Sequence, residues 1–98
     1  MDVSFADDDL ERLFTDADYS GGFSRAIVRS FRQKVQFLLA AEDERDLRQW
    51  KSLHYERLKG QRKHQWSIRL NQQWRLILEK QEAGGATRLV LIGIEDYH

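Results

Sequence analysis

The sequence lacks cysteine, proline and any long hydrophobic run. Without cysteine, the chain can form neither a disulfide scaffold nor a catalytic thiolate. No apolar run approaches the roughly 18 residues that a membrane span requires. The N-terminus also lacks the basic and then apolar pattern of a secretory signal. We therefore expect a cytoplasmic protein that has no membrane partner.

No repeat or low-complexity linker marks a domain boundary, and the absence of proline removes another common boundary signal. The chain has 98 residues, whereas chains usually divide into domains only above about 200 to 300 residues. Hydrophobic residues make up 41%, with three Trp, three Tyr and five Phe, which argues against disorder. We expect one domain over residues 1–98.

The formal net charge is zero, from 16 basic and 16 acidic residues, which on its face argues against a nucleic-acid partner. The two halves differ, however. Residues 1–46 hold eleven acids and six bases, whereas residues 47–98 hold five acids and ten bases. A basic surface attracts polyanions over about a Debye length, roughly 8–10 Å, whatever the total charge. The C-terminal half therefore remains a candidate for binding RNA.

The N-terminal part predicts a short strand followed by two helices. Residues 3–5 can form the strand, and Asp7 then offers an N-cap for a short helix that ends before Tyr19-Ser20-Gly21-Gly22. A longer helix is expected over residues 24–41, where apolar side chains repeat with the 3.6-residue period.

Three arginines of the longer helix, Arg25, Arg29 and Arg32, fall on one face at i, i+4 and i+7. A solvated helix face is the simpler interpretation, and a binding role is the alternative. After this helix, residues 42–50 are predicted to form an acidic loop with room for one more helical turn.

From His54 onward the hydrophobic period changes to two, which indicates strands. A hairpin is expected around the polar residues 71–73. Its alternation places Arg69 and Arg75 together on the face opposite the apolar one. Trp66 and Trp74 lie on the apolar face, so we expect them to be core residues rather than base-stacking platforms.

Gly84 and Gly85 predict a second turn, and residues 87–94 are apolar on both faces, as expected of a central, covered strand. The predicted fold class is α+β, with a short N-terminal strand and two helices packed on a C-terminal, mainly antiparallel sheet.

Metal-binding and phosphate-loop motifs are not apparent, because the three histidines are widely spaced and no glycine-rich loop precedes a Lys-Ser or Lys-Thr pair. Basic, imidazole and phenol side chains remain, and such groups suit RNA cleavage. Imidazoles can transfer the protons of the 2′-hydroxyl and the 5′-oxygen, while arginine and lysine neutralise the phosphorane. The same side-chain types also serve structural roles, so both interpretations stay open.

Three blocks of sequence resemble the core signature of the HigB-type toxins of the RelE/ParE toxin superfamily. They are LKGQR at 58–62, QWSIRLN at 65–71 and QWRL at 73–76. The ending Asp96-Tyr97-His98 is similar to the terminal Asp-Tyr-His of that family. His64 differs, since relatives often carry glycine there, and the spacer that follows His54 is longer than in the relatives compared.

The resemblance implies a RelE-like fold and the toxin of a type II toxin–antitoxin system. Such a toxin is a metal-independent, ribosome-dependent endoribonuclease that cleaves mRNA in the A site, inhibits translation and needs no cofactor. Its partners would be the ribosome, mRNA and a cognate helix-turn-helix antitoxin of the HigA type. The resemblance assigns catalytic roles to His54, Arg75, Asp96, Tyr97 and His98, and RNA contacts to Lys59, Arg62, Lys63 and Arg69.

Within the assigned residues, His54 and His98 are the best candidates for proton transfer, and neither is identified as the base or the acid. Two other functions stay open for a chain of this superfamily. One is inhibition of DNA gyrase in the manner of ParE, and the other is an inactive member that only binds its antitoxin.

Overall fold

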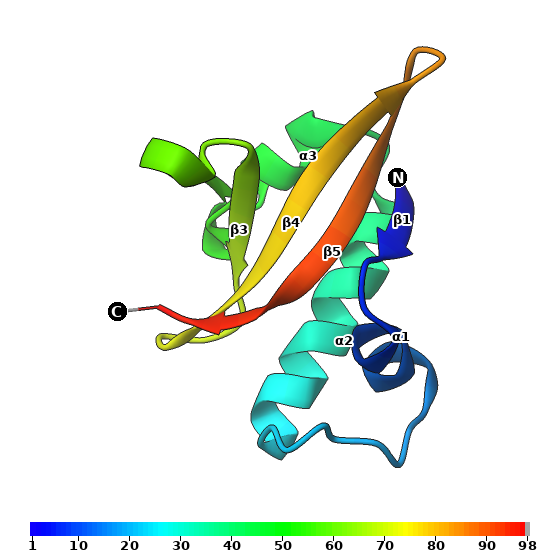
Figure 1. The fold of residues 1–98 in the computed structure, drawn as a ribbon, viewed down its shortest axis with the longest axis vertical. Helices are drawn as coiled ribbons and strands as arrows, with labels where there is room; N and C mark the ends of the chain where they lie inside the picture. The colour runs from blue at the N-terminus through cyan, green and yellow to red at the C-terminus, as the bar shows by residue number, and fades with distance from the viewer. Residues whose placement is uncertain (98) are drawn as a thin grey trace.

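The computed structural model describes residues 1–97, which form a single five-stranded sheet with all the helices on one side (Figure 1). This architecture confirms the predicted α+β class. In chain order the elements are β1 (Asp2–Phe5), α1 (Asp8–Thr15), α2 (Arg25–Ala40), α3 (Glu44–Gln49), η1 (Lys51–Leu53), β2 (Glu56–Arg57), η2 (Gly60–Arg62), β3 (Gln65–Arg69), β4 (Trp74–Ala83) and β5 (Ala86–Asp96), where η marks a 3₁₀ turn.

The strand order in the sheet is β1-β5-β4-β3-β2. Only the β1–β5 pair is parallel, so the sheet is mainly antiparallel, as predicted. Strand β5 is central, between β1 and β4, but the helices cover only one of its faces. Val90 on its other face is therefore half-buried, which differs from the strand covered on both sides that its apolar pattern indicated.

The long β4–β5 hairpin contains a register shift. Ile77 pairs with Gly93, whereas the next residue, Leu78, pairs with Leu91, which leaves Ile92 as one extra residue on β5. This is a β-bulge. At the far end, the predicted turn at Gly84–Gly85 forms with φ values of +60° and +82°, a left-handed backbone that glycine adopts at no steric cost.

The helices begin where their sequences offer caps. The Asp7 side chain accepts a hydrogen bond from the Asp9 N–H at 2.8 Å, and Ser24 caps α2 in the same way. Asp43 likewise caps α3, so the segment 42–50, predicted as a loop with at most one turn, contains a six-residue helix. Within residues 1–97, none of the helices has the length and apolar character needed to cross a membrane.

The core lies between the helices and the sheet face that they cover. Apolar residues of α2 spaced three and four apart, such as Phe31 and Val35, are fully buried, as are Leu76 and Leu78 of β4. Burying one such side chain contributes about 1.5–3 kcal/mol to the free energy of unfolding. Trp66 and Trp74 are partly buried and pack against this core, as predicted, and Trp74 meets the ring of Phe23 edge-on at 5.7 Å between centroids.

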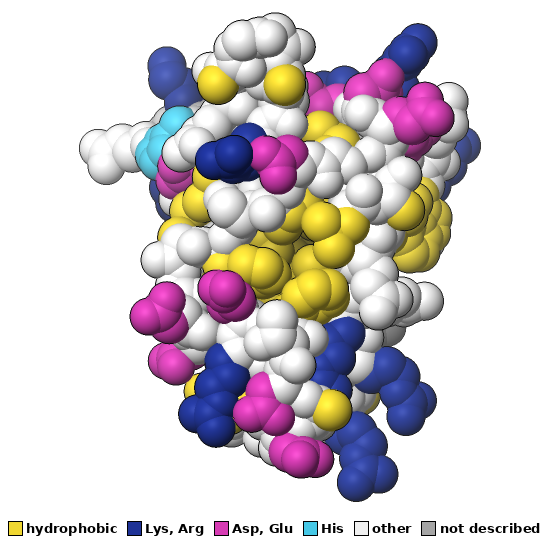
Figure 2. Space-filling model, turned by 90° about the vertical axis from the view of Figure 1, so that its right-hand side faces the viewer, with side chains coloured by type: hydrophobic (Ala, Val, Ile, Leu, Met, Phe, Trp, Pro, Cys, Tyr) yellow, Lys and Arg dark blue, Asp and Glu magenta, His cyan; other side chains and the backbone are white. Residues whose placement is uncertain are grey.

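The side of the molecule that carries β1 and α1 has an uneven charge distribution (Figure 2). Hydrophobic side chains reach the surface near its centre, acidic side chains lie on the left flank, at the upper right and at the bottom, and basic ones gather mainly at the lower right. The zero net charge is therefore an average over unlike surfaces as well as over unlike halves of the sequence.

Candidate functional site

The sheet face turned away from the helices carries two of the arginines singled out from the sequence, Arg69 and Arg75, and none of α1, α2 and α3 lies on it (Figure 1). Strand pairing places Arg69 of β3 opposite Arg75 of β4, and Arg75 opposite Glu95 of β5. The predicted juxtaposition of Arg69 and Arg75 is thereby confirmed. We call the part of this surface around the paired arginines the open face; it consists of Gln65, Ser67 and Arg69 of β3, Arg75, Ile77 and Glu79 of β4, and Gly93 and Glu95 of β5.

Arg75 lies at the centre of the row that Arg69, Arg75 and Glu95 form across three strands, and it is only 8% exposed. Its Nε and Nη1 atoms are buried and find no hydrogen-bond partner in the part of the chain that the structure describes. The ring of Tyr97 lies against its guanidinium, with the ring centroid 4.4 Å from Cζ. A buried cation without an acceptor is costly, and so are like charges directly opposite each other on neighbouring strands. An anion bound between Arg69 and Arg75 would relieve both costs.

Glu95 is the cross-strand neighbour of Arg75, yet it binds a different arginine. Its two carboxylate oxygens accept hydrogen bonds from Arg62 Nη1 at 2.9 Å and Nη2 at 2.8 Å. Arg62 also donates from Nε to Gln65 Oε1 at 2.9 Å. The hydrogen bonds to Glu95 raise the pKa of Arg62 above its ordinary value. The carboxylate closest in register to Arg75 is therefore already engaged.

His54 reaches the row from the end of η1. Its backbone is left-handed, with φ at +51°, an uncommon conformation for a residue other than glycine. The Nε2 atom lies 3.1 Å from Arg69 Nη1. Because a guanidinium only donates hydrogen bonds, Nε2 is the acceptor, and a neutral ring then carries its proton on Nδ1.

The β3–β4 turn holds the last described residues against the sheet. The Tyr97 N–H donates to the Gln73 carbonyl at 2.6 Å, and the Gln73 side-chain amide donates to Asp96 Oδ2 at 3.0 Å. The Asn71 side chain in turn accepts hydrogen bonds from the backbone N–H groups of Gln73 and Trp74. His98, to which the resemblance gives a catalytic role, lies outside the described residues.

The remaining predicted RNA contacts do not join the row. Lys59 and Lys63 flank η2, both are exposed, and neither forms an ion pair with a residue in the described range. His64 is also exposed, with Nε2 at 3.8 Å from a carboxylate oxygen of Glu79. Of the four predicted contacts, only Arg62 and Arg69 therefore lie in the cluster. Over residues 1–97, no three His, Asp or Glu side chains are close enough together to hold a metal ion.

Three residues of the site had no role assigned from the sequence. Gln65 and Gln73 orient charged side chains by hydrogen bonds, and Glu95 binds Arg62. The period-two alternation already places Gln65 on the face of Arg69, so that signal was present. The contacts of Gln73 and Glu95 depend on which segments the fold brings together.

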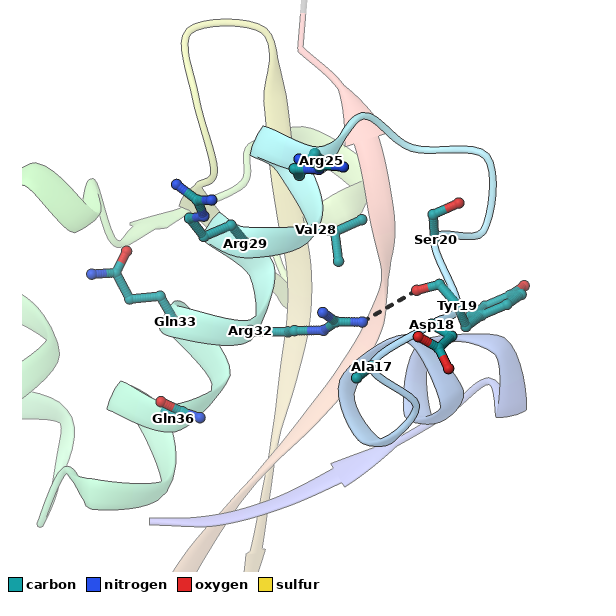
Figure 3. Close-up of a pocket in the computed structure, with 10 residues that line it drawn as sticks. All are labelled: Ala17, Asp18, Tyr19, Ser20, Arg25, Val28, Arg29, Arg32, Gln33 and Gln36. Carbon is teal, nitrogen blue, oxygen red and sulfur yellow. Dashed lines mark hydrogen bonds between the residues drawn. The ribbon is translucent and has the colours of Figure 1, made fainter.

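A hollow with a volume of about 820 Å³ lies elsewhere, between α2 and residues 17–20 (Figure 3). Arg32 reaches into it and donates hydrogen bonds to three backbone oxygens within residues 13–19, at 2.8 to 3.2 Å. Arg25 and Arg29 line the hollow and remain exposed. The arginine trio thus divides into one residue that holds α1 against α2 and two that are solvated.

Chemically, the open face combines a buried cation, a second cation beside it, an imidazole nitrogen that can accept a proton, and a phenol. Guanidinium groups bind phosphate oxygens through paired, charge-assisted hydrogen bonds. This set is suited to binding and polarising a phosphate group.

The comparisons with known proteins agree with this fold. The family model described as RelE-like toxin of type II toxin-antitoxin system HigB matches residues 3–91. The solved structure of a YoeB/ParE toxin from Agrobacterium tumefaciens is similar, with a TM-score of 0.56 and 19% identity over 100% of both chains. No curated protein sequence matches. The chain therefore belongs to the HigB-like family of RelE-like toxins of type II toxin–antitoxin systems.

Proposed function

We propose that this toxin is a ribosome-dependent endoribonuclease that cleaves mRNA in the A site, inhibits translation and requires neither metal nor cofactor. The observation that carries the proposal is Arg75, a guanidinium buried on the open face beside Arg69 with two nitrogen atoms unpartnered in the described structure. A phosphate of the RNA backbone supplies the oxygen acceptors that this group lacks.

In the proposed reaction, the 2′-oxygen of the RNA attacks the adjacent phosphorus and the bond to the 5′-oxygen breaks. Arg75 and Arg69 neutralise the negative charge of the phosphorane. His54 and His98 are the candidates for removing the 2′-hydroxyl proton and for protonating the 5′-oxygen, and their order is left open. Tyr97 supports the guanidinium of Arg75.

The other assigned residues act around this centre. Asp96, bound by Gln73, holds the C-terminal segment against the β3–β4 turn. Lys59 and Lys63 are exposed beside η2, where they can contact phosphates that flank the scissile one.

The test uses translating ribosomes with a defined mRNA and maps cleavage by primer extension. Wild type should cut within the A-site codon, and Arg75→Ala should cut about 10²–10³-fold more slowly, as expected for the loss of one transition-state donor. His98→Ala tests the terminal imidazole in the same assay. An Arg88→Ala variant is the matched control, because Arg88 is an exposed arginine of β5 that pairs with Asp2 at the opposite end of the sheet.

Two outcomes would contradict the proposal: no cleavage by wild type, or normal cleavage by both the Arg75 and the His98 variants. Inhibition of DNA gyrase is the alternative, since one fold can carry both activities. It would produce DNA cleavage complexes and an SOS response, whereas mRNA cleavage stops protein synthesis directly. Absence of growth arrest on expression would favour an inactive, antitoxin-binding member.

As a type II toxin the protein has an antitoxin partner. We propose that this partner is of the helix-turn-helix, HigA type and that both proteins act in the cytoplasm. A basic surface on the toxin favours an acidic antitoxin surface. The affinity of the complex should fall as salt rises, and an affinity that is unchanged between low and high salt would count against electrostatic attraction.

A further inference from the structure

We propose that Arg62 is a positioning residue that keeps Arg75 available to phosphate by holding Glu95 away from it, rather than a direct RNA contact. This inference rests on the proposed phosphate site at Arg75. It changes the role that the resemblance assigned to Arg62, and it gives Glu95 a role for the first time.

Glu95 lies beside Arg75 in the sheet. Glu95 pairs in register with Arg75, and the Cα atoms of such directly opposite residues lie about 4.5–5.5 Å apart. A carboxylate so close to a buried guanidinium is its natural partner, because the pair would satisfy N–H groups that otherwise lack an acceptor. Left free, Glu95 would therefore compete with phosphate for Arg75.

The contact between Arg62 and Glu95 prevents this competition. Arg62 reaches from η2 and binds both oxygens of Glu95, at 2.8 and 2.9 Å. Gln65 fixes the third donor of Arg62, its Nε, at 2.9 Å. These contacts hold the guanidinium of Arg62 in one orientation and keep the Glu95 oxygens directed toward it.

If Arg62 bound RNA itself, it would have to release Glu95. The Arg62 and Glu95 side chains are 46% and 44% exposed, so their ion pair contributes little to the stability of the fold. If Arg62 left Glu95 to bind a phosphate, the released carboxylate would lie opposite Arg75 and repel the same phosphate. A direct contact between Arg62 and RNA would therefore weaken phosphate binding at Arg75.

The experiment compares wild type, Arg62→Ala, Glu95→Gln and the double variant. Each is titrated with a short single-stranded RNA whose riboses are 2′-O-methylated, so that no cleavage can occur. We expect Arg62→Ala to weaken binding about tenfold, the effect of one charge-assisted hydrogen-bonded pair. Glu95→Gln should bind at least as tightly as wild type, and the double variant should recover wild-type affinity within about twofold.

A double variant that binds as weakly as Arg62→Ala would overturn the inference and identify Arg62 as a direct RNA contact. Wild-type affinity in the Arg62→Ala variant would also overturn it. If wild type itself binds no RNA, the phosphate site fails and the inference fails with it. Binding with the predicted rescue but without cleavage on ribosomes would instead support the positioning role and reject the nuclease.

A second readout needs no RNA. In the free protein, the Nε–H resonance of Arg75 should shift in Arg62→Ala, because Glu95 then pairs with Arg75, and Glu95→Gln should reverse that shift. The matched control is the exposed Arg88–Asp2 pair at the other end of the sheet, with a 2.9 Å contact. Arg88→Ala removes the same charge, and it should leave both the resonance and the RNA affinity unchanged.

Discussion

The two faces of the sheet are formed by the same strands, yet they differ in whether their buried groups have partners. Successive residues of β4 alternate between them: Leu76 and Leu78 are fully buried against the helices, whereas Arg75 is nearly as buried but has two unpartnered nitrogens in the described structure. One face therefore stabilises the fold, and the other contains groups that the fold alone leaves unsatisfied. Burial alone does not distinguish a residue that stabilises the fold from one that is available to a ligand. The distinction depends on whether the buried polar atoms have hydrogen-bond partners.

The open face carries further costs that the covered face lacks. Arg69 and Arg75 face each other as like charges, and His54 adopts a left-handed backbone conformation. Such features persist only where the surrounding structure supports them, and they gather at functional sites. We expect the covered face to supply that support.

The largest expected effect on stability comes from substituting neighbouring residues on the two faces. Leu76→Ala should lower the free energy of unfolding by about 2–5 kcal/mol, because it leaves a cavity among fully buried side chains. Arg75→Ala should lower it by less than about 1 kcal/mol or raise it, since it removes an unsatisfied buried charge. Urea denaturation of both variants measures the difference.

The control for Arg75→Ala is Arg75→Met, which keeps an apolar stem beside Tyr97 and removes only the charge. If the Arg75 variants were destabilised as much as Leu76→Ala, Arg75 would be part of the structural core, and the contrast between the faces would fail.

A smaller effect is expected at His54. His54→Gly should be more stable than His54→Ala by about 1 kcal/mol, because glycine adopts a φ of +51° without steric cost. Both variants remove the imidazole, so both should lose cleavage activity equally on programmed ribosomes. Thermal denaturation together with the cleavage assay separates backbone strain from chemistry; equal stability of the two variants would argue against strain at this position.

The smallest effect is expected at the rim of the covered face. Burial opposes ionisation of Glu44, but hydrogen bonds from Lys80 at 2.9 Å and Tyr55 at 3.0 Å lower its pKa below the ordinary value. A carboxyl group whose pKa is lower in the folded state contributes stability above its unfolded pKa of about 4.3, and the contribution is lost as pH falls through the folded pKa.

Glu44→Gln should therefore cost about 0.5–1 kcal/mol at pH 7 and nearly nothing at pH 2. Urea denaturation at the two pH values measures this difference. Asp43→Asn is a less suitable control for the loss of one carboxylate charge, because Asp43 also caps α3. A cost of Glu44→Gln that does not change with pH would show that packing, not charge, explains the contribution.

Much of the fold could be predicted from the sequence, because its local signals agree. The 3.6-residue period and Ser24 locate α2 within one residue at each end, and the period-two alternation places Arg69 beside Arg75. The helix α3 was expected only as one possible turn, because six residues are too few to show a period. Its cap, Asp43, was the available signal.

The state of the site residues could not be predicted in the same way. An arginine in a strand is ordinarily expected to be solvated, and only the packing of Tyr97 and the neighbouring strands makes Arg75 buried. The pairing of Arg62 with Glu95 joins residues 33 positions apart. Whether a carboxylate binds one arginine or another depends on tertiary distances, which hydrophobic patterns do not encode.

The bulge opposite Ile77 and Leu78 decides which side chains of β5 lie on the open face. Since side chains alternate along a strand, the extra residue Ile92 reverses which side every later residue of β5 points to. If β5 ran on from Leu91 without a bulge, Glu95 would point toward the helices, and Ile94 would take its place beside Arg75. Loss of the single residue Ile92 would close the bulge and leave Glu95 opposite Arg75, whereas loss of two residues would turn the later side chains of β5 to the opposite face. Among homologues, a β5 that is one residue shorter at this point should therefore lack the bulge and keep the same residues on the open face.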